Sequence, residues 1–98
     1  MFEIAIRENG HIALSGRLDS AQRDKAQAFF ESVDRPEVLD FSALEYISSA
    51  GLGVLLVVQK RAVANGGGLT IINVNKHISD VFRFSGFDKI FRIEPASR

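Results

Sequence analysis

Two adjacent serines, Ser48 and Ser49, are the residues of this chain best placed to do chemistry. They fall where a strand-like apolar segment gives way to a helix-like one, so we expect them at or beside the start of a helix. A helix start exposes unpaired backbone N–H groups and the positive end of the helix dipole, which together stabilise a phosphate ester. The chemistry that this position favours is reversible phosphorylation of a hydroxyl group.

A serine before an apolar helix also has a simpler interpretation. Serine is a preferred N-cap, because its side-chain oxygen satisfies one of the orphan N–H groups of the first turn. Gly51 and Gly53 favour a functional role, since they leave the first turn bare and each costs up to ~1 kcal/mol relative to alanine inside a helix. Close packing of the helix on a sheet would compensate for that cost, and so would close approach of another protein.

The familiar catalytic and cofactor-binding patterns do not fit this sequence. Ile47 stands where the first glycine of G-x-S-x-G would be, which argues against a serine hydrolase. Gly66–Gly68 lacks the spacing of a phosphate loop and follows a helical segment, so it predicts a helix stop. Asp19 and Asp40 each follow a strand-like segment and are expected to be caps. We therefore expect no catalytic residue, no cofactor and no metal site.

Length and charge restrict the remaining classes of function. The 98 residues suffice for one domain, expected to span residues 1–98. Twelve basic residues balance twelve acidic ones, which argues against nucleic acid as a partner and favours a protein. The sequence has no cysteine, no leader-like segment and no long apolar run, so we expect a cytoplasmic protein without direct membrane insertion.

The first third of the chain predicts a hairpin and a helix. Apolar and polar residues alternate on both sides of a turn at Asn9-Gly10, as in a β-hairpin with one buried face. The period then becomes helical, and we expect a helix from Ser20, as its N-cap, to about Val33. The residues predicted to face inward are Ala21, Ala26, Phe29, Phe30 and Val33.

The middle of the chain alternates strand and helix. A strand is expected after Pro36, ending at Asp40-Phe41-Ser42, and a helix from Ala50 to Asn65, followed by a strand over Leu69–Val74. The apolar positions that suit burial of this helix are Leu52, Leu55, Leu56, Val58 and Val63. This alternation predicts parallel crossovers. The expected fold is a small α/β domain with a mixed β-sheet, built from an N-terminal hairpin plus parallel βαβ units and covered by helices.

The end of the chain is rich in phenylalanine. Asn75 can cap a helix that breaks near Ser85-Gly86, and a short final strand is expected around Phe91, followed by a frayed end over Pro95–Arg98. Spacing favours core positions for Phe82 and Phe91, whereas Phe84 and Phe87 flank the break, so one of them is a candidate for exposure at a partner surface.

Four segments together resemble one family over nearly the whole chain. They are Gly16-Arg17-Leu18-Asp19, Asp40-Phe41-Ser42, Ser48-Ser49-Ala50-Gly51-Leu52-Gly53 and HISDVFRFSGFDKIF over 77–91. This pattern is similar to the sulphate-transporter and anti-sigma-factor-antagonist (STAS) domain. The resemblance implies a non-enzymatic binding module. In stand-alone bacterial members, an anti-sigma factor that is itself a serine kinase phosphorylates the serine or threonine at the helix start, and a serine phosphatase reverses this. The unphosphorylated form binds the anti-sigma factor.

Aligned on Gly51-Leu52-Gly53, the family acceptor falls on Ser49. The residue before it is often Asp in the family and is Ser48 here, which makes Ser48 a rival acceptor; the residue after it is often Ser or Thr and is Ala50 here. The resemblance implies a partner-binding surface formed by Asp19, Asp40, Ser48, Ala50, Gly51, Leu52 and Gly53. Some relatives lack phosphorylation, so the alternative is a constitutive subunit of a lipid- or anion-transport complex or of another signalling complex.

Overall fold

Five strands and three helices alternate along the computed structural model, which describes residues 1–96. In chain order they are β1 (Phe2–Ile6), β2 (Ile12–Leu18), α1 (Arg23–Glu31), β3 (Val38–Ile47), α2 (Ser49–Ala64), β4 (Thr70–Val74), α3 (Lys76–Ser85) and β5 (Arg92–Pro95). Short 3₁₀ turns over Ser20–Gln22 and Phe87–Lys89 precede α1 and β5.

The strands form one mixed sheet in the order β1-β2-β3-β4-β5. β1 and β2 pair antiparallel as the predicted hairpin, and its turn places Gly10 at φ +88°, a backbone conformation that glycine adopts without strain. Every later pair of neighbouring strands is parallel, with one helix in each connection. The structure therefore confirms the predicted α/β fold, with its hairpin and its parallel βαβ units.

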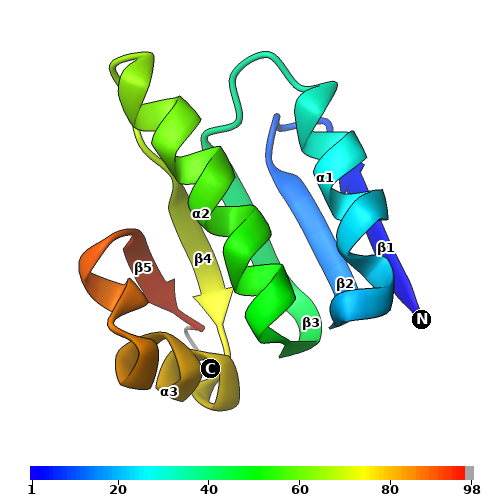
Figure 1. Ribbon diagram of the computed structural model, residues 1–98, viewed down its shortest axis with the longest axis vertical. Helices are drawn as coiled ribbons and strands as arrows, with labels where there is room; N and C mark the ends of the chain where they lie inside the picture. The colour runs from blue at the N-terminus through cyan, green and yellow to red at the C-terminus, as the bar shows by residue number, and fades with distance from the viewer. Residues whose placement is uncertain (97–98) are drawn as a thin grey trace.

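Helices cover one face of the sheet. Figure 1 shows α1 and α2 side by side in front of the strands, with α3 past the end of β4. Between the helices and the sheet lies the core, in which Phe30 and Leu55 meet buried strand residues such as Leu39. On the opposite face, Asp40 and its strand neighbours are only half-buried. The helices thus pack on only one face of the sheet within residues 1–96.

All three helices begin at the same edge of the sheet, because each follows the carboxyl end of a parallel strand. We call this the carboxyl edge. The residue that directly follows each strand caps what comes next: Asp19 after β2, Ser48 after β3 and Asn75 after β4. The fold therefore gathers three helix starts and three polar capping side chains along one edge.

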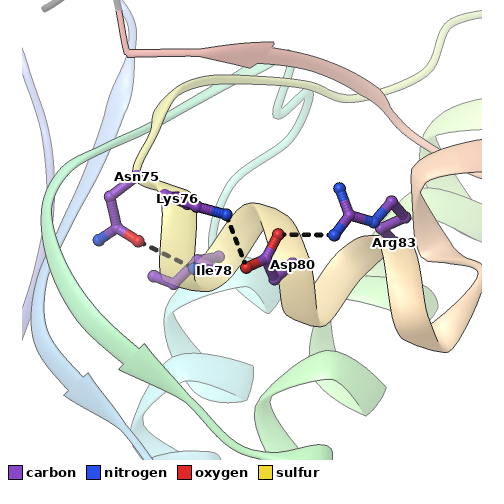
Figure 2. A network of polar contacts seen from close by, with 5 residues as sticks. All are labelled: Asn75, Lys76, Ile78, Asp80 and Arg83. Carbon is purple, nitrogen blue, oxygen red and sulfur yellow. Dashed lines mark hydrogen bonds and ion pairs between the residues drawn. The ribbon is translucent and has the colours of Figure 1, made fainter.

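Figure 2 shows the start of α3 at this edge. The Asn75 side chain accepts a hydrogen bond from the backbone N–H of Ile78 at 2.8 Å, as predicted for a cap. One turn on, the carboxylate of Asp80 pairs with Lys76 at 3.2 Å and with Arg83 at 3.0 Å. These exposed pairs support the helix weakly.

Two predicted boundaries are wrong. β3 does not end at Ser42 but continues to Ile47, so Asp40 lies within the strand and not after it. The first helix begins later than expected, because the Asp19 side chain, and not Ser20, caps a 3₁₀ turn by accepting from the N–H of Ala21 at 3.1 Å. Ala21 is consequently exposed, whereas Ala26 and Phe30 are buried as predicted.

Burial also departs from prediction on α2. Leu55 is fully buried and Leu52 nearly so, but Leu56 is only half-buried and Val63 is 55% exposed. Val63 follows buried Ala62, and one residue further along a helix turns the side chain by about 100° away from the buried stripe.

The C-terminal segment confirms the phenylalanine predictions. Phe82 and Phe91 are core residues with ring centroids 6.0 Å apart, and of the two flanking residues Phe84 is the exposed one, at 81%. The predicted fraying is wrong at Pro95, which pairs with Val74, and at Ala96, whose N–H donates to the carbonyl of Val74. Ser97 and Arg98 lie outside the described residues.

Candidate functional site

Ser48 is the N-cap of α2. Its backbone is extended, with φ −93° and ψ 174°, and its Oγ accepts a hydrogen bond from the N–H of Gly51 at 3.2 Å. Its own N–H donates to the carbonyl of Leu18 at 2.9 Å, which ties the helix start to the end of β2. The side chain is half-buried. The hydroxyl of Ser48 is therefore engaged in the cap that a serine at this position is expected to make.

Ser49 is the first residue of α2 and is exposed. The first turn of the helix contains no acidic residue, and the next side chain is the small one of Ala50. A phosphate on Ser49 would lie beside the unpaired N–H groups and the positive end of the α2 dipole, without a carboxylate in the same turn. The two serines thus differ in kind: one caps the helix and the other faces outward.

The two glycines of this turn also differ. A Cβ placed on Gly51 would come within 2.8 Å of Leu18 Cγ and 2.9 Å of Ile47 Cγ1, so this glycine is required by close packing of α2 on β2 and β3. A Cβ on Gly53 would meet nothing within 4 Å. The two explanations that the sequence left open therefore apply to different residues: packing accounts for Gly51, while Gly53 leaves open space at the surface.

The structure brings most of the predicted site residues together at the carboxyl edge. Leu18 and Ile47 are the last residues of β2 and β3 and are paired, so Asp19 and Ser48 directly follow neighbouring strand ends. Leu52 is 8% exposed, and its N–H donates to the carbonyl of Ser48 at 2.9 Å. We call Asp19 together with residues 48–53 the helix-start site.

Asp40 does not belong to this site. It lies eight residues before Ser48 on β3, a separation of up to about 26 Å along an extended strand. Its Oδ1 accepts from Asn73 Nδ2 at 3.1 Å and from the N–H of Ser42 at 2.9 Å. Partial burial raises the pKa of Asp40, but the hydrogen bonds from Asn73 and Ser42 and the charge of Arg7 outweigh it and hold the pKa below its ordinary value. Asp40 thus links β3 to β4.

A groove between α1 and α2, next to the helix-start site, was not predicted. Its volume is about 300 Å³, and Ala50 and Gly53 belong to both features. The lining residues are Arg23, Gln27, Phe30, Glu31, Ala50, Gly53, Val54, Val57, Val58 and Arg61. The sequence held one signal for it: α2 is apolar beyond its buried stripe, and Val57, at 65% exposure, is among the residues that the sheet does not cover.

Within residues 1–96, no three His, Asp or Glu side chains come close enough together to hold a metal ion. None of the helices in this part of the chain is both long and apolar enough to cross a membrane.

Known proteins match this chain along almost its whole length. The profile of the family described as "Mlab, STAS domain" matches residues 4–94. A protein of Bordetella bronchiseptica named as an anti-sigma factor antagonist, BtrV, is 39% identical over 84 residues, which cover 82% of this chain and 72% of BtrV.

Two solved structures show the same fold at low sequence identity. An anti-sigma factor antagonist from Mycobacterium paratuberculosis has a TM-score of 0.82 at 20% identity, covering 99% of this chain and 86% of that one. The Bacillus cell fate determinant SpoIIAA, in its phosphorylated form, has a TM-score of 0.66 at 20% identity, covering 95% and 90%. From the profile match and the BtrV similarity together, this chain belongs to the STAS domain family, among the anti-sigma factor antagonists.

Proposed function

We propose that this chain is a phosphorylation-switched anti-sigma factor antagonist whose acceptor is Ser49. In its unphosphorylated form it binds and sequesters an anti-sigma factor that is also a serine kinase. Phosphorylation of Ser49 by that kinase dissociates the complex, and a serine phosphatase restores the form that binds. The chain acts in the cytoplasm as a binding module and a substrate of catalysis, and not as a catalyst.

The observation that carries this proposal is the division of roles between the two serines. Ser48 Oγ is engaged by the N–H of Gly51, so modifying it would remove the cap of α2. Ser49 is exposed and is not needed for the cap, so modifying it leaves the helix intact. A kinase can therefore modify Ser49 without unfolding the domain that it has to recognise.

The effect of the phosphate falls on the partner rather than on the fold. It adds a charge of about −1.5 to −2 at the surface. The helix dipole tolerates that charge, but a partner packed against a bare helix turn has to desolvate or repel it. SpoIIAA, which shares the fold, has been solved in both its phosphorylated and unphosphorylated forms, which supports a switch that preserves the domain.

Partner binding is proposed to use the helix-start site. Gly53 leaves the surface of the first two turns of α2 open, and Ala50 adds only a methyl group. Asp19 directly follows the neighbouring strand β2 and contributes a carboxylate to the site. Such a surface of small side chains with one polar end suits close approach by a protein partner.

The second candidate function is that of a constitutive STAS subunit of a transport or other signalling complex, with both serines unmodified. The description of the matching family profile and the engaged state of Ser48 favour it. In that case Ser49 would be only an exposed helix residue.

The experiment that separates the two is affinity purification of the chain from its own cells, followed by mass spectrometry of co-purified proteins and of phosphorylated residues. The switch predicts a serine kinase among the partners and phosphate on Ser49. Phosphate on Ser48 alone would move the acceptor by one residue, and transport proteins without any phosphosite would establish the second candidate.

A further inference from the structure

The groove between α1 and α2 has the size and lining of a small-ligand site. Its walls are largely apolar, with Phe30 and Val58 buried at its base and Val57 exposed at its rim. A volume of about 300 Å³ lies at the lower end of the range for ligand pockets. At roughly 30 Å³ for each non-hydrogen atom, as in liquid water, it would hold about ten such atoms.

One end of the groove carries a free cation. Arg23 is exposed and takes part in no ion pair or side-chain hydrogen bond within residues 1–96. The other arginine of the groove is committed, because Arg61 Nη2 donates to the carbonyls of Phe30 and Val33 at 2.8 and 2.9 Å, at the C-terminal end of α1. Arg61 Nε is buried and has no hydrogen-bond partner within residues 1–96, but Nη2 of the same group is held by the two carbonyls. Arg23 is therefore the arginine of the groove whose whole guanidinium group is open to a ligand.

The helix dipoles also favour an anion at the Arg23 end of the groove. Arg23 is the first residue of α1, and Figure 1 shows that α1 and α2 begin at the same end of the sheet, so the positive ends of two helix dipoles lie on the Arg23 side. Glu31, hydrogen-bonded to Gln27 at 3.3 Å, is the last residue of α1 and lies about two turns beyond Arg23, toward the opposite end. The lining includes two arginines, Arg23 and Arg61, against one carboxylate, Glu31, and the positive helix ends lie beside Arg23, so an anion is attracted to the Arg23 end.

From this arrangement we propose that the groove binds a small aliphatic carboxylate of about ten non-hydrogen atoms. The carboxylate pairs with Arg23, and the hydrocarbon chain lies along Val54 and Val57 toward Phe30. This site shares Ala50 and Gly53 with the helix-start site but does not include the acceptor serine.

Gly53 is consistent with such a ligand. It lines the groove and has open space where its Cβ would be, so a larger side chain would project into the groove without clashing with the rest of the domain. Gly53→Leu is therefore a variant that fills the site while leaving the core packing unchanged.

The test is a titration of ¹⁵N-labelled protein with sodium octanoate, followed by amide chemical shifts, with octan-1-ol and octylammonium as uncharged and cationic probes. We expect saturable shifts at Ala50, Gly53 and Val57 with a dissociation constant of about 1 mM or tighter. Octanol should bind more weakly, and octylammonium should cause no saturable shift.

Four variants locate the site. Arg23→Gln should weaken octanoate at least fivefold and octanol less than twofold, whereas Gly53→Leu should weaken both at least tenfold. Arg35→Gln and Val63→Leu, exposed controls outside the groove, should stay within twofold of the wild type. Thermal melts check that each variant is folded.

Three results would overturn the proposal. The first is a set of shifts that do not saturate or that fall outside the groove, and the second is equal binding of octanoate and octylammonium. The third is a set of groove shifts that change with protein concentration in the absence of ligand, which would assign the groove to a second copy of the chain.

Discussion

At the scale of single residues, neighbouring positions of the same type have different physical roles. Ser48 gives its hydroxyl to the helix cap, while Ser49 presents its hydroxyl to solvent. Gly51 fits against Leu18, while Gly53 faces open space. Each pair separates what the fold needs from what a partner or ligand could use.

The cap can be tested directly. Ser48→Ala should lower the free energy of unfolding by about 1 kcal/mol, because the N–H of Gly51 loses its acceptor. Ser49→Ala should leave it unchanged within about 0.5 kcal/mol, since an exposed first-turn side chain contributes little. Urea denaturation of both variants measures the difference. Equal losses would mean that the two serines share the cap.

Replacing Gly51 and Gly53 by alanine is expected to change the stability of the domain in opposite directions. Gly51→Ala should destabilise the domain, since its Cβ would collide with Leu18 and Ile47. Gly53→Ala should stabilise it by up to about 1 kcal/mol, because alanine is the better helix former and nothing obstructs it. Thermal unfolding of the two variants, compared with the wild type, measures both effects. A loss of stability in Gly53→Ala would show that this glycine has a structural role after all.

The sequence predicted the helix start but not this division of roles. Apolar periodicity and the turn residues are local signals, and they placed both serines correctly at the start of α2. Which glycine is packed, and where the backbone N–H of Ser48 donates, depend on Leu18 of β2, about thirty residues earlier in the chain. Such long-range contacts leave no local pattern in the sequence.

At the scale of elements, α2 has one side in the core and another lining the groove. Leu55→Ala should cost about 2–5 kcal/mol, because Leu55 is fully buried and truncation leaves a cavity. Val57→Ala, a matched truncation on the same helix at a 65% exposed position, should cost less than about 0.5 kcal/mol. Denaturant midpoints of the two variants provide the comparison. Similar losses would show that α2 does not present Leu55 to the core and Val57 to solvent.

The hydrogen-bonded link between β3 and β4 through Asp40 predicts that the stability of the fold depends on pH. Because the folded-state pKa of Asp40 lies below its ordinary value, the folded protein binds this proton less readily than the unfolded chain. The ionised carboxylate therefore stabilises the fold above about pH 4, and that contribution is lost as the pH falls through the lowered pKa.

Asp40→Asn should accordingly be less stable than the wild type at pH 7, by no more than about 1 kcal/mol since the group is largely hydrated. The difference should shrink toward pH 3. Asp34→Asn, at an exposed carboxylate for which no partner is seen within residues 1–96, serves as the control. A difference that is constant with pH would assign the effect to shape and not to charge.

The extent of β3 shows where element prediction failed. The sequence after Asp40 mixes exposed and buried residues, and the structure has two register irregularities between β2 and β3. A bulged strand loses strict alternation, so the period-2 signal weakens where the strand in fact continues. The expected site consequently included Asp40, which the longer strand carries away from the serines.

At the scale of the whole molecule, the topology brings the site together. Each parallel crossover returns the chain so that the next helix starts at the carboxyl edge, where Asp19, Ser48 and Asn75 follow successive strands. The order of hairpin and crossovers was predictable from local periods. The groove was not, because it depends on how two helices distant in sequence lie against each other.

We propose that a phosphate on Ser49 controls binding of a protein partner. Calorimetric titration against the purified kinase partner tests this, with two otherwise identical samples, one unphosphorylated and one stoichiometrically phosphorylated on Ser49. We predict at least tenfold weaker binding of the phosphorylated form, equivalent to about 1.4 kcal/mol, with Ser49→Ala binding like the unphosphorylated protein. Equal affinities of the two forms would contradict the switch and leave the chain as a constitutive subunit.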